Sequence, residues 1–191
     1  MSRLGSHPGP AWIKDVLRQA NGQESAGKLD EIADSLVGRA IDPRQVGGNP
    51  VVHASASEAV GALVIAGLIG PVPGRPYQGA FDRLVRVHQR ATAGDVRARA
   101  LAGLLSVTSP RTRAIAYLRD VAESKDPSAY NAMEFLITDV RGGSWGGVSP
   151  TLAQQQESAA ALKGMVAAQR GSDPKALQLL SGWVASSQSK K

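Results

Sequence analysis

The stretch DVRARALAGLL, residues 95–105, decides the fold. Its apolar residues recur at helical spacing, and a four-position pattern within it occurs three times along the chain. The copies are Val60-Gly61-Val64-Leu68, then Val96-Arg97-Ala100-Leu104 after 36 residues, then Ala129-Tyr130-Met133-Ile137 after a further 33. Self-similarity at a period of about 20–50 residues indicates a repeat architecture. A second amphipathic helix follows each copy, so the pattern predicts a series of helix pairs.

Helical signals also dominate the rest of the chain. Aromatic residues make up 4% of the sequence, β-branched residues are few and no stretch alternates as a strand would, so no strand is expected. Polar residues precede most segments; Ser57 or Ser55, for example, is a candidate N-cap. We predict helices over residues 11–20, 25–41, 57–70, 77–92, 96–107, 111–124, 128–140, 150–169 and 174–186.

The best of the three copies, residues 95–124, resembles a HEAT-type repeat in the sequence Asp95-Val96-Arg97-x-x-Ala100-x-x-x-Leu104. The Asp126-Pro127 and Asp173-Pro174 helix openings are in the same style. The resemblance covers residues 57–186 and implies antiparallel helix pairs stacked in a right-handed α-solenoid. The first and third copies depart from it, with Gly61 and Tyr130 at the arginine position. We therefore expect an all-α fold, either a short HEAT-like α-solenoid or an irregular helical bundle.

This reading gives a domain organisation. A single helix pair cannot bury its own apolar face, so neighbouring pairs must stack. Residues 1–10 are expected to be a flexible N-terminal arm and residues 11–41 a helical cap or hairpin. Residues 57–186 would hold the repeats, with a glycine-rich insertion at 141–148, and residues 187–191 a polar tail.

Composition excludes several classes of function. The 191 residues contain no cysteine, which excludes disulfides, thiolate metal sites and cysteine nucleophiles. The longest uncharged run, residues 59–74, is shorter than the roughly 20 residues of a spanning helix, so we expect no membrane span. Residues 1–10 have no apolar core and do not form a secretory signal, which favours the cytoplasm.

Catalytic signatures are missing from the sequence. It has no phosphate-binding glycine loop, nucleophile elbow or paired zinc-binding histidines. The three histidines are scattered, and His88 lies at helical spacing from Phe81 and Leu84, which predicts a place at the edge of the core. We therefore expect a non-enzymatic protein without cofactor or metal. An enzyme of the HEAT-like group, such as a lyase or a nucleic-acid enzyme, is the less favoured alternative.

Positive charge is concentrated in the middle of the chain. The span 75–119 holds nine arginines and two acids, a balance of +7, whereas the whole chain has a net charge of +6. Arg83, Arg86 and Arg90 fall within about 60° on a helical projection, away from the apolar stripe, so they are expected to form an exposed ridge. Arg111 and Arg113 stand at a helix start, where the macrodipole disfavours cations, so another contact or solvation must stabilise them.

These charges suggest a partner-binding surface formed by Arg83, Arg86, Arg90 and Arg113. Trp145, within the glycine-rich Arg141–Gly147, is a candidate apolar anchor, or it folds back onto the helices. An acidic protein is the expected partner, and a nucleic acid is the alternative. The arginines could also be a solvated face. A purely structural subunit would instead expose apolar surface near residues 59–70 or 176–184 and self-associate.

Overall fold

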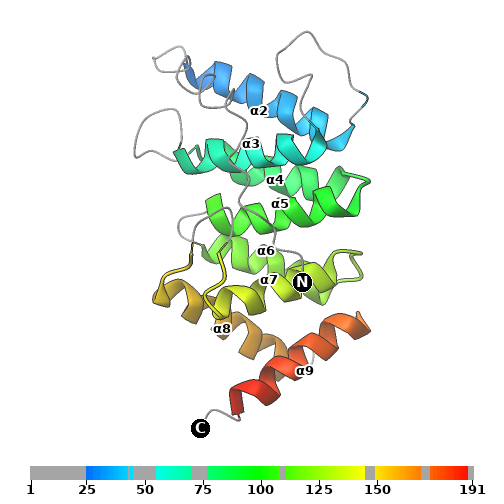
Figure 1. Ribbon diagram of the computed structural model, residues 1–191, viewed down its shortest axis with the longest axis vertical. Coiled ribbons are helices and arrows are strands. Elements are labelled where there is room, and N and C mark those ends of the chain that lie inside the picture. The colour runs from blue at the N-terminus through cyan, green and yellow to red at the C-terminus, as the bar shows by residue number, and fades with distance from the viewer. Residues whose placement is uncertain are drawn as a thin grey trace. The chain divides into compact units, whose positions relative to one another are not determined.

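A computed structural model of the chain describes residues 25–42, 44, 55–69, 77–107, 111–144, 149–168 and 173–188. All regular structure in these residues is α-helical, which confirms the predicted fold class (Figure 1). The predicted helix over 11–20 and the arm at 1–10 lie outside them, as do residues 189–191 of the predicted tail at 187–191. Residues 187 and 188 of that tail belong to the last helix. The helices are α2 (Ser25–Ile41), α3 (Ala56–Ile69), α4 (Gly79–Arg90), α5 (Gly94–Val107), α6 (Thr112–Glu123), α7 (Ala129–Val140), α8 (Leu152–Ala168) and α9 (Pro174–Gln188).

Side-chain caps set several of the helix starts. Ser55 Oγ accepts a hydrogen bond from the Glu58 N–H at 3.2 Å, and the Glu58 carboxylate accepts one from the Ser55 N–H at 2.7 Å. This reciprocal capping box satisfies two backbone donors at the start of α3. Thr151 and Gln154 form the same arrangement before α8. Of the two serines predicted as the N-cap of α3, Ser55 is therefore the one used.

The chain divides between residues 108 and 109 into two compact units, and the first contains α2 to α5. Here α2 packs against α4, and α3 packs against α5, while consecutive helices also pack together. Asp34 of α2 meets Arg83 and Arg86 of α4, whereas the start of α3 at Ser57 meets the start of α5 at Asp95. The first helices of the two pairs are thus neighbours, as are the second helices, an arrangement compatible with a helical repeat.

The second unit contains α6 to α9 and has a similar order of neighbours. In it α7 packs against α6, α8 and α9, and α6 packs against α8. Arg111, just before α6, reaches Asp139 at the end of α7, so these two helices are antiparallel. Gly142, directly after α7, adopts a φ of +78°, a conformation that glycine tolerates best, as the chain turns toward α8.

The core explains the uniformly apolar character of α3. Ala59, Val60, Ala62 and Leu63 are each no more than 1% exposed, because α3 lies against α2, α4 and α5. On α9, the residues that pack inward are also covered; they are Ala176, Leu180 and Trp183. These side chains are buried within the chain, but others in the same two stretches are only half-buried, among them Val64, Leu68, Leu177, Leu179 and Val184. The alternative of a structural subunit therefore stays a prediction.

Close packing at α3 depends on two glycines. A Cβ added to Gly67 would lie 2.6 Å from Val107 Cγ1 and 2.8 Å from Ala80 Cβ. A Cβ on Gly103 of α5 would lie 2.6 Å from Val64 Cγ2. Gly61, also on α3, faces open space at the Cβ position. Glycine is thus required at 67 and 103 by the close approach of neighbouring helices.

None of the helices within the described residues combines the length and apolar character needed to cross a membrane.

Candidate partner-binding surface

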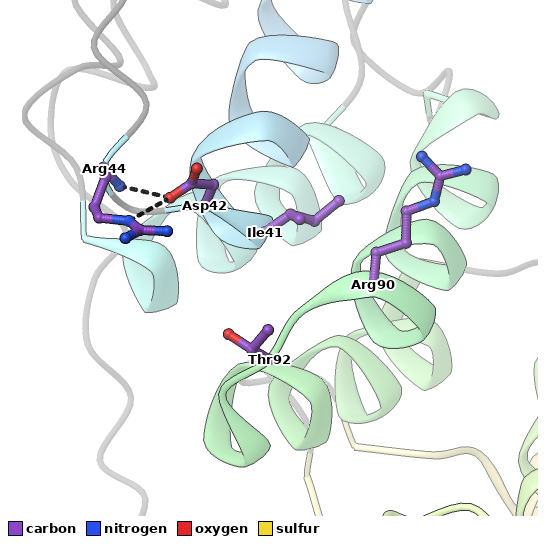
Figure 2. Close-up of a pocket in the computed structure, with 5 residues that line it drawn as sticks. All are labelled: Ile41, Asp42, Arg44, Arg90 and Thr92. Carbon is purple, nitrogen blue, oxygen red and sulfur yellow. Dashed lines mark hydrogen bonds and ion pairs between the residues drawn. The ribbon is translucent and has the colours of Figure 1, made fainter.

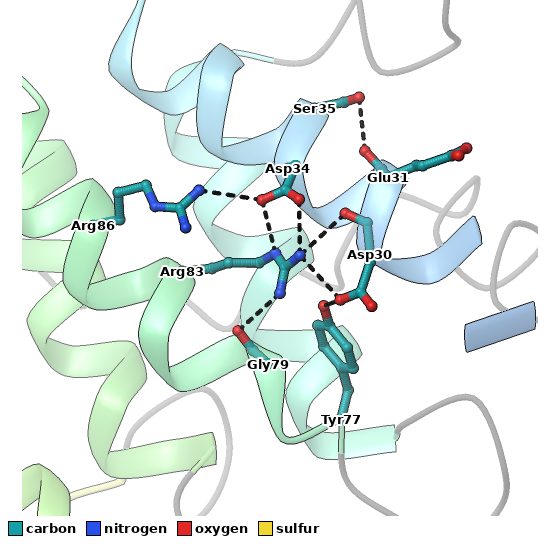
Figure 3. A network of polar contacts seen from close by, with 8 residues as sticks. All are labelled: Asp30, Glu31, Asp34, Ser35, Tyr77, Gly79, Arg83 and Arg86. Carbon is teal, nitrogen blue, oxygen red and sulfur yellow. Dashed lines mark hydrogen bonds and ion pairs between the residues drawn. The ribbon is translucent and has the colours of Figure 1, made fainter. Parts of the chain in front are cut away.

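The structure places the Arg83 side chain against α2, whereas the helical projection predicted that it would be exposed. This side chain is 13% exposed and turns toward α2 instead of projecting into solvent (Figure 3). The guanidinium donates from Nε to Asp34 Oδ1 at 3.1 Å and from Nη2 to Asp34 Oδ2 at 2.9 Å. The projection identified the face of α4 away from its own apolar stripe, but it could not show that α2 covers part of this face. The expectation of a fully exposed three-arginine ridge is therefore wrong at Arg83.

Further contacts enclose the Arg83 guanidinium. Nη2 lies 3.0 Å from Asp30 Oδ1 and donates to the Asp30 main-chain oxygen at 3.3 Å, while Nη1 donates to the Gly79 carbonyl at 3.4 Å. The guanidinium carbon lies 5.4 Å from the centre of the Tyr77 ring, within cation–π range. The Tyr77 hydroxyl donates to Asp30 (Figure 3). This network joins the start of α4 to the middle of α2.

The electrostatics of the network follow from these contacts. Burial, and then the hydrogen bond to Asp30, raise the pKa of Tyr77 well above its ordinary value, so the phenol is a stable donor. Burial alone would lower the pKa of Arg83, but the hydrogen bond to Asp34 and the neighbouring carboxylates raise it overall. Arg83 is thus an internal cation matched to two α2 carboxylates.

Arg86 and Arg90 remain accessible on α4. Arg86 Nη1 lies 3.3 Å from Asp34 Oδ1, and its side chain is 49% exposed. Arg90 is exposed in the last turn of α4 and has no ion pair with any residue that the structure describes. The three arginines therefore differ: Arg83 is largely enclosed, Arg86 lies between α2 and solvent, and Arg90 is exposed without an ion pair among the described residues.

Arg90 lies at an open hollow of about 480 Å³ where α2 and α4 end (Figure 2). The other described residues that line it are Ile41, Asp42, Arg44 and Thr92. The Arg44 N–H and Nε donate to Asp42 Oδ1 at 3.0 and 3.4 Å. The backbone hydrogen bond from Arg44, then its side-chain hydrogen bond, lower the pKa of Asp42. Asp42 and Arg44 neutralise each other, which leaves Arg90 as the surplus charge among these lining residues.

The remaining predicted site residues lie apart from α4 in the chain. Arg113 is exposed on α6 and belongs to the second unit. Trp145 lies outside the described residues, so neither reading of it is decided. The structure thus groups Arg83, Arg86 and Arg90 on one helix, and the roles of Arg113 and Trp145 stay predictions.

A buried polar cluster in the second unit was not predicted as such. Arg111 is 4% exposed and its Nη2 donates to Asp139 Oδ1 at 2.5 Å. The fully buried Ser158 of α8 donates to the other Asp139 oxygen at 2.6 Å. The unfavourable position of Arg111 at a helix start indicated that another contact must stabilise it, and Asp139 is that contact. No feature of the sequence around Asp139 predicted that this carboxylate would be the contact.

Other reactive groups do not converge. His88 is 1% exposed and lies within the core rather than at its edge. In the part of the chain that the structure describes, no cluster of three or more histidine or acidic side chains could hold a metal ion. No protein-family model, curated protein or solved structure matches the chain. The arginines of α4 and the hollow beside Arg90 are therefore the features on which a functional argument can be built.

Proposed function

We propose that the chain is a non-enzymatic binding or scaffold protein of the HEAT-like type, and that it docks an acidic macromolecular partner in the cytoplasm through arginines. The neighbour pattern of α2 to α5 supports a repeat of helix pairs, because it is the one expected when two antiparallel pairs stack. The pairs are α2 with α3 and α4 with α5, so they begin one helix earlier than the copies predicted from the sequence. Arg86 and Arg90 are the principal partner contacts on α4. Arg113 of the second unit and Trp145 stay further candidate contacts, as predicted from the sequence.

The observation that carries this proposal is the exposed Arg90, which has no ion pair among the described residues, one turn beyond the half-exposed Arg86. Guanidinium groups bind carboxylates in a two-pronged geometry that lysine cannot reproduce. Arg83 has a different role in this proposal from the one first expected. It is a positioning residue that holds α4 against α2, so that the arginines one and two turns further along are presented at a fixed angle.

An acidic protein fits this surface better than a nucleic acid. Nucleic-acid binding depends on neutralising a run of closely spaced phosphates. Here Arg83 and Arg86 lie beside the α2 carboxylates Asp30 and Asp34, whose side chains are 53% and 50% exposed. These carboxylates would repel a continuous phosphate backbone, whereas a discrete acidic side chain can bind Arg90, which has no ion pair with either of them.

A salt titration of binding tests this choice of partner. Labelled polyglutamate, a labelled RNA and a labelled DNA duplex are titrated with the full chain at several salt concentrations. We expect polyglutamate to bind at physiological salt and to be weakened moderately by added salt. Tighter binding of RNA or DNA, with a steep salt dependence, would make the protein a nucleic-acid binder. Binding of none of the three would mean that the arginines are only a solvated face.

A further inference from the structure

We infer that the hollow at the ends of α2 and α4 is a carboxylate-binding site that receives one acidic side chain, next to an apolar one, from the partner. The inference rests on the proposed function and deepens it. It assigns the recognition to Arg90, with Thr92 and Ile41 as the neighbouring surfaces (Figure 2).

The charges around the hollow set the kind of ligand. Asp30 and Asp34 are matched by Arg83 and Arg86, and Asp42 is matched by Arg44, with Arg39 of α2 as a further nearby cation outside the lining. Arg90 therefore adds one uncompensated positive charge to the described lining. A singly charged carboxylate neutralises one guanidinium, whereas a dianionic phosphate would leave a negative charge beside Asp42. The balance thus favours a carboxylate over a phosphate.

Because of where the hollow lies, an anion can bind in it only through Arg90. It lies at the carboxyl ends of α2 and α4, where the unpaired carbonyls carry partial negative charge. These carbonyls favour the Arg90 cation and disfavour a free anion. A carboxylate is therefore held here only where it reaches the guanidinium, which donates two parallel hydrogen bonds. The Thr92 hydroxyl is a further possible donor at the rim.

The size and lining of the hollow suit a short segment of chain. Its volume of about 480 Å³ falls within the roughly 300–1,000 Å³ of small-ligand sites. Ile41 supplies an apolar wall, so an apolar residue beside the acidic one would lose water-exposed surface on binding. One guanidinium and one apolar contact give weak affinity. An acidic partner gains strength by reaching Arg86 at the same time.

The probe is the peptide acetyl-Leu-Glu-Leu-amide, with acetyl-Leu-Gln-Leu-amide as its uncharged match. Nitrogen-15 spectra of the full chain report the side-chain Nε–H of each arginine, and Arg90→Lys and Arg99→Lys assign the signals of interest. Arg99 is exposed on α5 and does not line the hollow, so it is the internal control. We expect the glutamate peptide to shift the Arg90 signal saturably, at least five-fold more than the Arg99 signal. The glutamine peptide should shift neither.

Equal shifts of Arg90 and Arg99, or no shift, would overturn the carboxylate site. A saturable shift with inorganic phosphate but not with the glutamate peptide would also overturn it. Polyglutamate is titrated into the same samples. If polyglutamate binds while the peptide leaves the Arg90 signal unshifted, the carboxylate site at the hollow is wrong and the proposed function stands. If polyglutamate does not bind either, the proposed function fails as well.

Discussion

Arg111, which precedes α6, donates a hydrogen bond of 2.5 Å to Asp139 near the end of α7, and both side chains are buried. Ser158 of α8 satisfies the second carboxylate oxygen. One carboxylate thus joins three helices of the second unit. A buried ion pair contributes little net free energy relative to apolar residues of similar size, but removal of one partner is costly because the other charge stays buried.

Replacement of Asp139 by Ala should therefore lower the free energy of unfolding by about 3–5 kcal/mol, since it leaves the Arg111 guanidinium buried without its anion. Urea denaturation monitored by circular dichroism measures the change. The control is Asp120→Ala, which removes an exposed carboxylate 3.3 Å from Arg119 and should change stability by less than about 0.5 kcal/mol.

The double variant Arg111→Met with Asp139→Leu separates charge burial from general damage to packing. We expect it to be more stable than Asp139→Ala, because no uncompensated charge remains. A double variant that is less stable than the single one would contradict the role assigned to this pair.

Two glycines of α3 provide a matched test of helix packing. Gly67→Ala should destabilise the chain by about 1–3 kcal/mol, because its Cβ would overlap Val107 and Ala80. Gly61→Ala should stabilise it by roughly 0.5–1 kcal/mol, because alanine favours a helix and its Cβ meets no atom within 4 Å. Thermal unfolding compares the two; changes of the same sign would argue against the close contact of α3 with α4 and α5.

Arg83 and Arg90 should differ in their effect on stability. Arg83→Met is expected to cost about 1–2 kcal/mol, because Asp30 and Asp34 lose a largely enclosed cation but keep access to water. Arg90→Met should change the free energy of unfolding by less than about 0.5 kcal/mol, since Arg90 is exposed. Chemical denaturation measures the free energy of unfolding of both variants. Equal losses of stability would mean that the α2–α4 network does not depend on Arg83.

The capping box of α3 should give a small pH-dependent contribution to stability. The backbone hydrogen bond from Ser55, then the hydrogen bond with its side chain, lower the pKa of Glu58 from its ordinary 4.5. A lowered folded-state pKa means that the stabilisation is complete above the unfolded value and is lost as the pH falls through the folded one. Glu58→Gln should therefore be less stable than the parent chain at pH 7. Denaturation curves at decreasing pH should show the gap between the two narrowing below pH 4.5, as Glu58 becomes protonated in the folded state. A gap unchanged by pH would contradict the assignment.

The sequence predicted the helices well because their signals are local. The apolar spacing of Leu29 to Val37 and the caps at Ser55 and Asp173 depend on residues close together in the chain. The predicted helix over 77–92 was too long, since Tyr77 and Thr92 lie outside α4. Extended backbone at Ala91 ends this helix before Thr92, which places Thr92 at the rim of the hollow.

The candidate site was predicted less completely because it depends on contacts between distant residues. The charge count drew attention to α4, but Asp30 and Asp34 lie about 50 residues from Arg83 in sequence. A projection of one helix cannot show which of its arginines a neighbouring helix neutralises. The hollow also combines Ile41 with Arg90, and only the packing of α2 against α4 brings these residues together.

The most direct test of the central claim compares two variants with the same net charge. Arg86→Ala with Arg90→Ala removes the accessible arginines of α4, whereas Lys163→Ala with Lys175→Ala removes two exposed lysines from α8 and α9. Polyglutamate binding is measured by fluorescence anisotropy at physiological salt. We predict at least a ten-fold loss of affinity for the arginine variant and less than a two-fold loss for the lysine variant. Equal losses would show that the attraction is due to net charge alone and would contradict a docking surface on α4.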